Sequence, residues 1–415
     1  MKIFSRQSPN ITLKDFKAVF KTVRQGKVFQ GPLAEAFERR LAEYIGVKYV
    51  VLVNMGRTAE LVALEGLNFS KGDEIIVPSY NFPIVPIIVK MLGLKPVFVD
   101  VDPDTFNIDP CLIENSITPR TKAILITHMC GHPCEMDKIV EIKNKYGLRL
   151  IEDGVHSLGA EYKGQKVGTF GDVGYFSFYV GKAMTTFMGA AVCTNDKEIF
   201  ERMKNIVGGY ARLSVSGLLD AFWYGVLTYF LTKPAIFSLT VYPVLLLLNS
   251  FNSQALDAKM EESLDIPEKL EPSYLTKFTN FQAAAGLSQV NNFENSISQR
   301  INNSLLLNDN IISGPMISTP IIRPGVKHSF LYYFLRAKDR KQFRKRLIFK
   351  GVDTKRDSNK ACSHLDIFKE EHKYCPISES ISEESILIPN YPLLSEKAIL
   401  YIAKAVNQIT NSDQD

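Results

Sequence analysis

The 415-residue sequence predicts an α/β fold. Between residues 12 and 205, short apolar runs rich in Val and Ile alternate with amphipathic stretches of helical period, and Gly, Pro and Asp separate them. The runs are apolar on both faces, which is typical of a mostly parallel sheet between two layers of helices. Apolar residues make up 46% and charged residues 22% of the chain, which excludes disordered, collagen-like and disulfide-scaffold classes.

The elements of this region follow from the same patterns. Helices are expected at residues 13–22, 33–44 and 57–67. Strands are expected at residues 49–53, 74–77, 96–99, 123–126, 149–151, 173–177 and 190–193. Because the helices serve as crossovers between parallel strands, we expect ligands beyond the carboxyl ends of the strands.

The C-terminal part has a different pattern. A charged helix is expected at residues 339–350 and an amphipathic helix at 395–408, which indicates a smaller α+β domain. The expected division is a large α/β domain over 1–209, an apolar insertion over 210–270, a return helix over 271–300 and the small domain over 301–415.

The apolar insertion is the unusual feature. Lys233 is the only charge between residues 221 and 256, and Pro234 and Pro243 cut the segment into pieces too short to span a bilayer. Its aromatic residues favour the level of the lipid headgroups. We therefore expect contact with a membrane surface through residues 217–250. A dimer contact, a substrate lid and ordinary core remain open alternatives.

Charge and cysteine content indicate the compartment. Forty-nine Lys and Arg against 44 Asp and Glu give a net charge of +5, and the basic residues are scattered, so nucleic acid is not an expected partner. Six cysteines are too few for a disulfide framework, and the first ten residues lack an apolar export segment. We expect a cytoplasmic protein, peripheral on the inner face of a membrane.

A first candidate site follows the strand at 49–53. Gly56, Arg57 and Thr58 open a helix, where backbone amides and the helix dipole favour an anion such as phosphate. Ordinary helix capping is the alternative explanation.

A second candidate follows the strand at 149–151. Glu152 and Asp153 end the apolar run, and His156 lies three residues after Asp153. Such a carboxylate can keep a heteroaromatic nitrogen protonated, act as a base or bind a metal, or it can simply cap a helix.

A third candidate follows the strand at 173–177. Ser177 ends the strand, and Lys182 lies beyond it next to aromatic residues. Desolvation could lower the pKa of this lysine and free its amine for bond formation with a carbonyl, although a plain surface lysine is the alternative.

A fourth motif alternates His and Cys between His128 and Cys134. These residue types bind soft metals, but the spacing differs from the paired spacing of common zinc sites. No metal is expected.

In their order along the chain these motifs resemble the DegT/StrS group of sugar aminotransferases, which are fold-type I enzymes that use pyridoxal 5′-phosphate (PLP). The resemblance covers residues 12–205 and 274–300 and weakens toward the C-terminus. The matching stretches are Gly31-Pro32, residues 56–59, 77–82, 96–100, 102–104, 152–153, 159–160, 171–178, Lys182, Gly189, residues 194–196, 282–284 and 286–287.

The resemblance implies a role for each candidate residue. Lys182 would bond the cofactor and shuttle a proton, and Asp153 would pair with the pyridine nitrogen. His156 would contact the phenolic oxygen, and Phe82 would stack on the ring. The phosphate would be bound by residues from two turns: Gly56, Arg57, Thr58 and Ser177. The cysteines near His128 would then be packing residues.

The sequence departs from the family in two places. Phe187-Met188-Gly189-Ala190 replaces a common Gly-Glu-Gly-Gly run, which puts the substrate pocket in question. Leu275 replaces an Asn that the neighbouring subunit commonly lends to the phosphate, while Lys277 lies where Arg is usual.

The implied reaction moves an amino group from an amino acid, usually glutamate, to a keto-sugar carried on a nucleotide, or here on a lipid, and the implied assembly is a homodimer. Three alternatives remain. A PLP sugar dehydratase usually has His in place of Lys182. A non-catalytic, membrane-attached binding protein could have kept the fold, and a nicotinamide oxidoreductase would require a G-x-G-x-x-G motif that is absent after the first strand.

Overall fold

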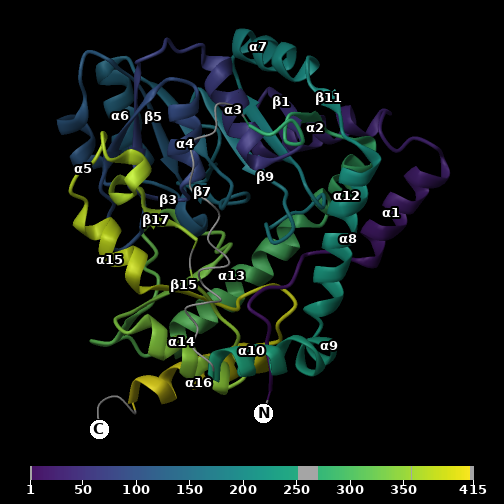
Figure 1. The fold of residues 1–415 in the computed structure, drawn as a ribbon, viewed down its shortest axis with the longest axis vertical. Helices are drawn as coiled ribbons and strands as arrows, with labels where there is room; N and C mark the ends of the chain where they lie inside the picture. The colour runs from purple at the N-terminus through teal and green to yellow at the C-terminus, as the bar shows by residue number, and fades with distance from the viewer. Residues whose placement is uncertain (1, 251–269, 357, 412–415) are drawn as a thin grey trace.

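The computed structural model describes residues 2–250, 270–356 and 358–411. It confirms the mixed α/β fold (Figure 1). The central sheet has nine strands in the order β11-β12-β1-β10-β9-β6-β5-β2-β4. Their bounds are β1 (Tyr49–Val53), β2 (Glu74–Pro78), β4 (Lys95–Val99), β5 (Thr121–Thr127), β6 (Arg149–Asp153), β9 (Val173–Ser177), β10 (Ala190–Thr194), β11 (Ala211–Arg212) and β12 (Thr276–Lys277).

Most of the sheet is parallel, which brings several strand ends to one edge. Strands β4, β2, β5, β6 and β9 pair in parallel, and β10 runs antiparallel to both β9 and β1. Strand β1 therefore runs in the same direction as the parallel set. The register places Val53 opposite Ala190 and Ala190 opposite Ser177, so β1 and β9 end side by side across β10.

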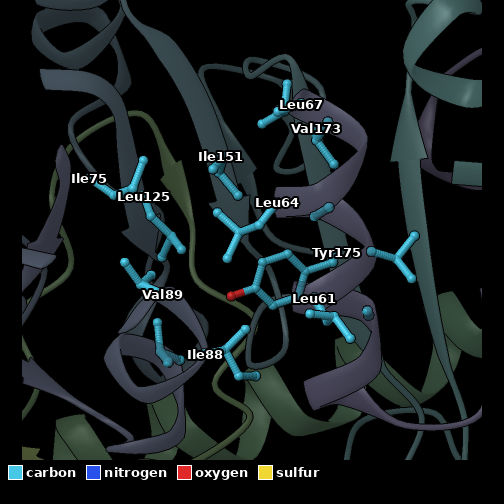
Figure 2. Packing of buried hydrophobic residues seen from close by; sticks show 14 of the residues in the cluster. Leu61, Leu64, Leu67, Ile75, Ile88, Val89, Leu125, Ile151, Val173 and Tyr175 are labelled. Atoms are coloured by element: carbon cyan, nitrogen blue, oxygen red, sulfur yellow. The ribbon is translucent and has the colours of Figure 1, made fainter. Parts of the chain in front are cut away.

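Helices cover both faces of this sheet. Helix α3 packs against β9 and β10 and against α4 and α7, and Figure 2 shows Leu61 and Leu64 of α3 next to Tyr175 of β9. Alternate residues of β1 enter different cores, since Val51 and Val53 pack with α3 while Val50 and Leu52 pack with α2. Both faces are buried, as predicted. The helices of this region are α1 (Leu13–Arg24), α2 (Leu33–Ile45), α3 (Gly56–Leu67), α4 (Ile84–Met91), α5 (Pro110–Ile113), α6 (Met136–Tyr146), α7 (Lys197–Gly208) and α12 (Asn280–Val290).

A second sheet, β13-β15-β18-β16, forms the C-terminal part with its own core. Its elements are α13 (Phe293–Asn310), β13 (Ile317–Ser318), β15 (Tyr333–Ala337), α14 (Arg340–Phe349), β16 (Lys355–Arg356), α15 (Pro376–Glu384), β18 (Ser385–Ile388) and α16 (Glu396–Asn411). The N-terminal segment joins this part, because Phe4 forms a parallel bridge with Val352. Two small sheets complete the fold: β14 (Val326–Lys327) with β7 (Glu161–Tyr162) and β8 (Gln165–Lys166), and β17 (Lys360–Ala361) with β3 (Tyr80–Asn81).

The segment after α7 forms three helices, α8 (Val215–Leu231), α9 (Pro234–Leu239) and α10 (Val241–Ser250). In Figure 1, α8 descends beside α12, and α9 and α10 lie at the bottom near α14. Among the residues the structure describes, no helix is both long and apolar enough to cross a membrane. Residues 251–269 of the predicted insertion lie outside the described residues, and the predicted domain boundaries stay a prediction.

Candidate active site

Lys182 lies in a tight loop between β9 and β10. Its backbone amide donates to the Tyr179 carbonyl at 3.0 Å, and the two ends of the loop are joined by a hydrogen bond from the Phe178 amide to the Gly189 carbonyl at 2.7 Å. The side chain is half-buried. A short loop tied at both ends fixes the lysine next to the carboxyl end of β9.

Asp153 is the last residue of β6 and is 1% exposed. Oδ1 accepts from the Val155 amide at 3.0 Å, and Oδ2 receives a longer contact of 3.4 Å from the Thr127 hydroxyl. Burial raises the pKa of this carboxyl to about 6, while the Val155 hydrogen bond and the nearby Lys182 ammonium act in the opposite direction. Asp153 therefore carries a negative charge at pH 7.

His156 lies between this carboxylate and the C-terminal sheet. Its ring meets Tyr332 edge to face at 5.3 Å, and its Nδ1 atom is buried with no hydrogen-bond partner among the described residues. Desolvation, assisted by the positive charges of Lys182 and Lys355, holds its pKa well below the usual value. The imidazole is neutral and has one nitrogen available to a ligand.

The turn before α3 lies directly against the end of β9. A Cβ on Gly56 would be 3.3 Å from both Cβ and Oγ of Ser177, so glycine permits this close approach. The first intrahelical hydrogen bond runs from Ala59 to Met55, and the amides ahead of it occupy the first turn, where anions are favoured.

Arg57 and Thr58 both contact Tyr274. The Arg57 guanidinium lies 4.7 Å from the centre of the Tyr274 ring, and the Thr58 hydroxyl donates to the Tyr274 carbonyl at 2.9 Å. The Thr58 hydroxyl proton is thus already used in a hydrogen bond within the chain. The predicted contribution of Thr58 to anion binding would then come from its backbone amide.

Phe82 follows β3 at the same edge. Its amide donates to Asn81 Oδ1 at 2.8 Å, and Asn81 Nδ2 donates to Thr127 Oγ1 at 3.0 Å. Since Thr127 also contacts Asp153, a chain of polar side chains connects Phe82 to the carboxylate. The predicted residues come from β1, β3, β6 and β9, and the fold brings them to one sheet edge.

A model of the DegT/DnrJ/EryC1/StrS aminotransferase family matches residues 9–407. The chain belongs to this family.

Relatives of the aminotransferase align over nearly its whole length. Uncharacterized protein MJ1066 of Methanocaldococcus jannaschii is 30% identical over 98% of this chain and 97% of its own. GDP-perosamine synthase of Escherichia coli O157:H7 is 29% identical over 98% of this chain and 99% of its own.

Solved structures share the fold. The S. venezuelae DesV structure in complex with a ketimine intermediate is 25% identical, with a TM-score of 0.75 over 95% of this chain and 94% of that one. An aminotransferase from Psychrobacter cryohalolentis is 24% identical, with a TM-score of 0.80 over 99% and 100% of the two chains. This protein is a fold-type I aminotransferase whose cofactor is PLP.

The residues at the edge fit that cofactor. The close Gly56–Ser177 approach and the first turn of α3 suit a phosphate, buried Asp153 suits a protonated ring nitrogen, and unpartnered His156 Nδ1 suits a ring oxygen. These individual roles stay predictions.

Beneath this edge, Glu152 organises a buried network of hydrogen bonds within the chain. One carboxylate oxygen contacts His128 Nε2 at 3.1 Å and the Gly168 amide at 2.7 Å, and the other accepts from the Phe170 and Gly171 amides at 2.8 and 2.6 Å. His128 Nδ1 in turn accepts from the Cys134 amide. Cys130 and Cys134 lie in apolar clusters, and no group of three His, Cys, Asp or Glu in the described residues could hold a metal.

Glu60 was not predicted as a site residue. It is 2% exposed on α3, and its Oε1 atom has no hydrogen-bond partner among the described residues. Burial and then the charge of Asp153 raise its pKa well above the usual value, against a smaller opposing effect of Arg57. The detectable signal was an acid in the middle of an apolar helix.

A small cleft begins next to Lys182. Its lining includes Gly181, Tyr332, Lys355 and Arg300. The Arg300 side chain donates from Nη1 to the Leu331 carbonyl, and Nε has no partner in the described part of the chain. No sequence pattern predicted this cleft, because its walls come from distant segments.

Helix α8 contacts the Lys182 loop at one residue before Lys182 and at one residue after it. Tyr224 stacks on Tyr179 with ring centres 5.8 Å apart, and Phe222 meets Phe187 at 5.3 Å. A Cβ on Gly225 would be only 2.5 Å from the Phe187 ring. The departure from the family at residue 187 thus supplies the ring on which α8 packs.

Proposed function

We propose that the aminotransferase transfers an amino group from glutamate to a keto-sugar carried on a nucleotide. The observation that carries the proposal is the meeting of Lys182, Asp153 and His156 at one sheet edge. Relatives named GDP-perosamine synthase and dTDP-3-amino-3,4,6-trideoxy-alpha-D-glucose transaminase support a nucleotide-linked sugar as acceptor.

PLP, when bound, supplies a carbonyl for the amino group and a ring that accepts electrons. Asp153 keeps its negative charge at pH 7 and so favours a protonated ring nitrogen. With the cofactor bound, the amine of Lys182 would accept and return the proton that moves in the reaction, as a general base and then a general acid. The basic groups of the cleft, Arg300 and Lys355, would attract the carboxylates of the donor or the phosphates of the acceptor.

Absorbance spectroscopy and peptide mapping test the proposal. Borohydride reduction of the PLP-loaded protein should attach the cofactor to Lys182. L-glutamate should convert the bound cofactor to its amine form in a single turnover, and a nucleotide-linked keto-sugar should reverse the change. Label on another residue, or no response to any amino acid, would contradict the proposal. The second result would favour the alternative of a non-catalytic binding protein.

The carrier of the sugar can be tested in the same assay. A lipid-linked keto-sugar is the second acceptor that we propose, because an apolar surface lies next to the Lys182 loop. Comparing the two carriers at equal concentration decides between them. The sugar dehydratase alternative would release a dehydrated sugar, whereas retained Lys182 favours amination.

We also propose a cytoplasmic homodimer that contacts a membrane surface through residues 217–250. In this subunit Leu275 packs partly buried against the main core, and Lys277 is exposed on β12. Lys277 is the residue available to a neighbouring site. Light scattering should give twice the subunit mass, and Lys277→Ala should weaken PLP binding more than it changes the assembly.

A further inference from the structure

Helices α8, α9 and α10 each expose large apolar side chains. On α8 the exposed side chains Leu219, Trp223, Leu227 and Phe230 recur every three or four residues, which places them on one face. Leu239 after α9's first turn and Leu247 on α10 expose 80% and 59% of their side chains. We call these six residues the apolar strip.

The opposite face of α8 is firmly packed. Leu218 and Phe222 lie in a cluster with Phe187 and Phe281, and Gly225 allows the helix backbone to approach the Phe187 ring. The four strip residues on α8 are therefore presented by a helix that is fixed to the body of the enzyme. Their exposure does not come from a loosely attached segment.

A basic helix lies next to the strip. Helix α14 contains five Lys and Arg residues and no acid. It contacts α10, where Asn249 Nδ2 donates to the Lys345 carbonyl at 3.2 Å, and Figure 1 shows both helices at the bottom of the molecule. Lys341 and Lys345 are exposed. Within α8, α9, α10 and α14 and their caps, as far as the structure describes them, the acids are Asp220 on α8 and Asp339, which caps α14.

We propose that the apolar strip and α14 together dock the enzyme on the surface of an anionic lipid bilayer. This inference rests on the proposed membrane contact and adds the chemistry of the surface. Apolar side chains enter the boundary between headgroups and acyl chains, while basic side chains pair with anionic headgroups. A second copy of the chain is less suited to the surface, because a twofold contact here would bring two α14 helices toward each other.

Vesicle flotation tests the proposal with the full, PLP-loaded chain. The protein should float with vesicles of phosphatidylcholine and phosphatidylglycerol and stay at the bottom with phosphatidylcholine alone. Because salt screens exposed charges, binding should weaken as ionic strength rises. Absence of flotation with both kinds of vesicle would overturn the proposal, as would equal binding to both.

Two variants separate the contributions. K341Q with K345Q should weaken partition to the anionic vesicles about 30-fold, since each basic residue near such a surface contributes about fivefold. The matched control K197Q with K204Q removes the same charge from α7 at the far end of the molecule and should change nothing (Figure 1). Equal loss in both double variants would leave only a net-charge effect and overturn the role of α14.

Trp223→Ser tests the strip. It should reduce flotation at least tenfold, while Tyr374→Ser, a control at a side chain that is 73% exposed elsewhere, should not. Circular dichroism confirms folding of each variant. If Trp223→Ser instead lowers the mass of the assembly in solution and leaves flotation intact, the strip is a contact between subunits. Single-turnover reaction with glutamate in vesicle-free buffer is independent of docking, so failure of catalysis and failure of docking are distinguishable.

Discussion

Helices α3 and α8 are both rich in apolar residues, yet most residues of α3 are buried and few residues of α8 are. Nine of the twelve residues of α3 are buried, including Glu60, one of its two acids. Only two of the seventeen residues of α8 are buried, although Asp220 is the single charge in that helix. Helix α8 is the more apolar of the two, yet fewer of its residues are buried. The sequence pattern predicted the helix at 57–67 but predicted no helix for residues 215–231, which were expected only to form an apolar insertion.

The difference has a physical origin in what each helix touches. Helix α3 lies between the sheet and two other helices and presents its first turn to the active-site edge. Helix α8 packs one face on the Lys182 loop and leaves the other exposed. The buried packing of α3 holds the active-site residues at its first turn in place. The exposed face of α8 is available for contact with a membrane surface. Substitutions in the two regions should therefore act on different measurements.

The largest effect is expected in the active site. Lys182→Ala should reduce turnover with glutamate by about 10²- to 10⁴-fold or more, because the group that moves the proton is lost. Stability and vesicle binding should remain unchanged. Single-turnover kinetics gives the loss, and Lys197→Ala on α7 is the control. Retention of more than a tenth of the rate would exclude Lys182 from the proton transfer.

The same substitution in the two helices should show the next largest contrast. Leu64→Ala removes a 1% exposed side chain from the main core and should cost about 2–5 kcal/mol of unfolding free energy. Leu227→Ala removes a 58% exposed side chain from α8 and should change stability by less than about 0.5 kcal/mol. Urea denaturation measures both. A cost above about 2 kcal/mol for Leu227→Ala would show that the strip is covered in solution.

A pH effect of about 3 kcal/mol is expected at Asp153. Its pKa rises from 3.8 to about 6 on folding, so its neutral form is favoured in the folded state. The contribution of Asp153 to stability is present below pH 4 and is lost as the pH rises through about 6. The side chain of Asp153→Asn does not titrate. The unfolding free energy of this variant, relative to wild type, should therefore rise by up to about 3 kcal/mol between pH 4 and pH 7.

Urea denaturation of the cofactor-free proteins at several pH values checks this prediction. Glu201→Gln, a change at an exposed acid on α7, should show a difference from wild type that is constant with pH. A constant difference for Asp153→Asn as well would mean that the carboxyl is not desolvated by folding. The sign matters more than the size, since a paired carboxylate would give the opposite trend.

Local patterns predicted the strands well and the helix limits less well. The strands expected at 49–53 and 173–177 match β1 and β9. A short apolar run between turn residues is typical of a buried strand. The segment is divided as expected, but the break before α10 lies at Thr240, three residues ahead of Pro243. Pro243 lies in the first turn of α10, where its missing N–H would have no intrahelical partner, so the helix includes it.

The candidate site divides in a similar way. Gly56, Asp153 and Ser177 could be found because each follows an apolar strand, and parallel strands end at one edge. Arg300 could not, since its importance depends on which segments pack around it, whereas Glu60 showed in the sequence only as an acid in an apolar helix. The same holds for Thr127, which reaches Asp153 only through the pairing of β5 with β6.

The smallest effect concerns the contact that joins the two regions. Gly225→Ala should cost about 1–3 kcal/mol, because the new Cβ would lie 2.5 Å from the packed Phe187 ring. Gly208→Ala on α7 is the control. A Cβ there meets nothing within 4 Å, and alanine should stabilise the helix by about 0.5–1 kcal/mol.

A double variant decides whether the Phe187 ring causes the effect. Phe187→Leu provides space for the new methyl group, so Gly225→Ala should cost less in that background, a coupling that a double-mutant cycle measures. Phe187 also has a positive φ of 70°, which a β-carbon disfavours, so the packing of α8 compensates for local strain. Additive costs of the two substitutions would mean that α8 does not rest on this ring, and the two regions would then be structurally independent.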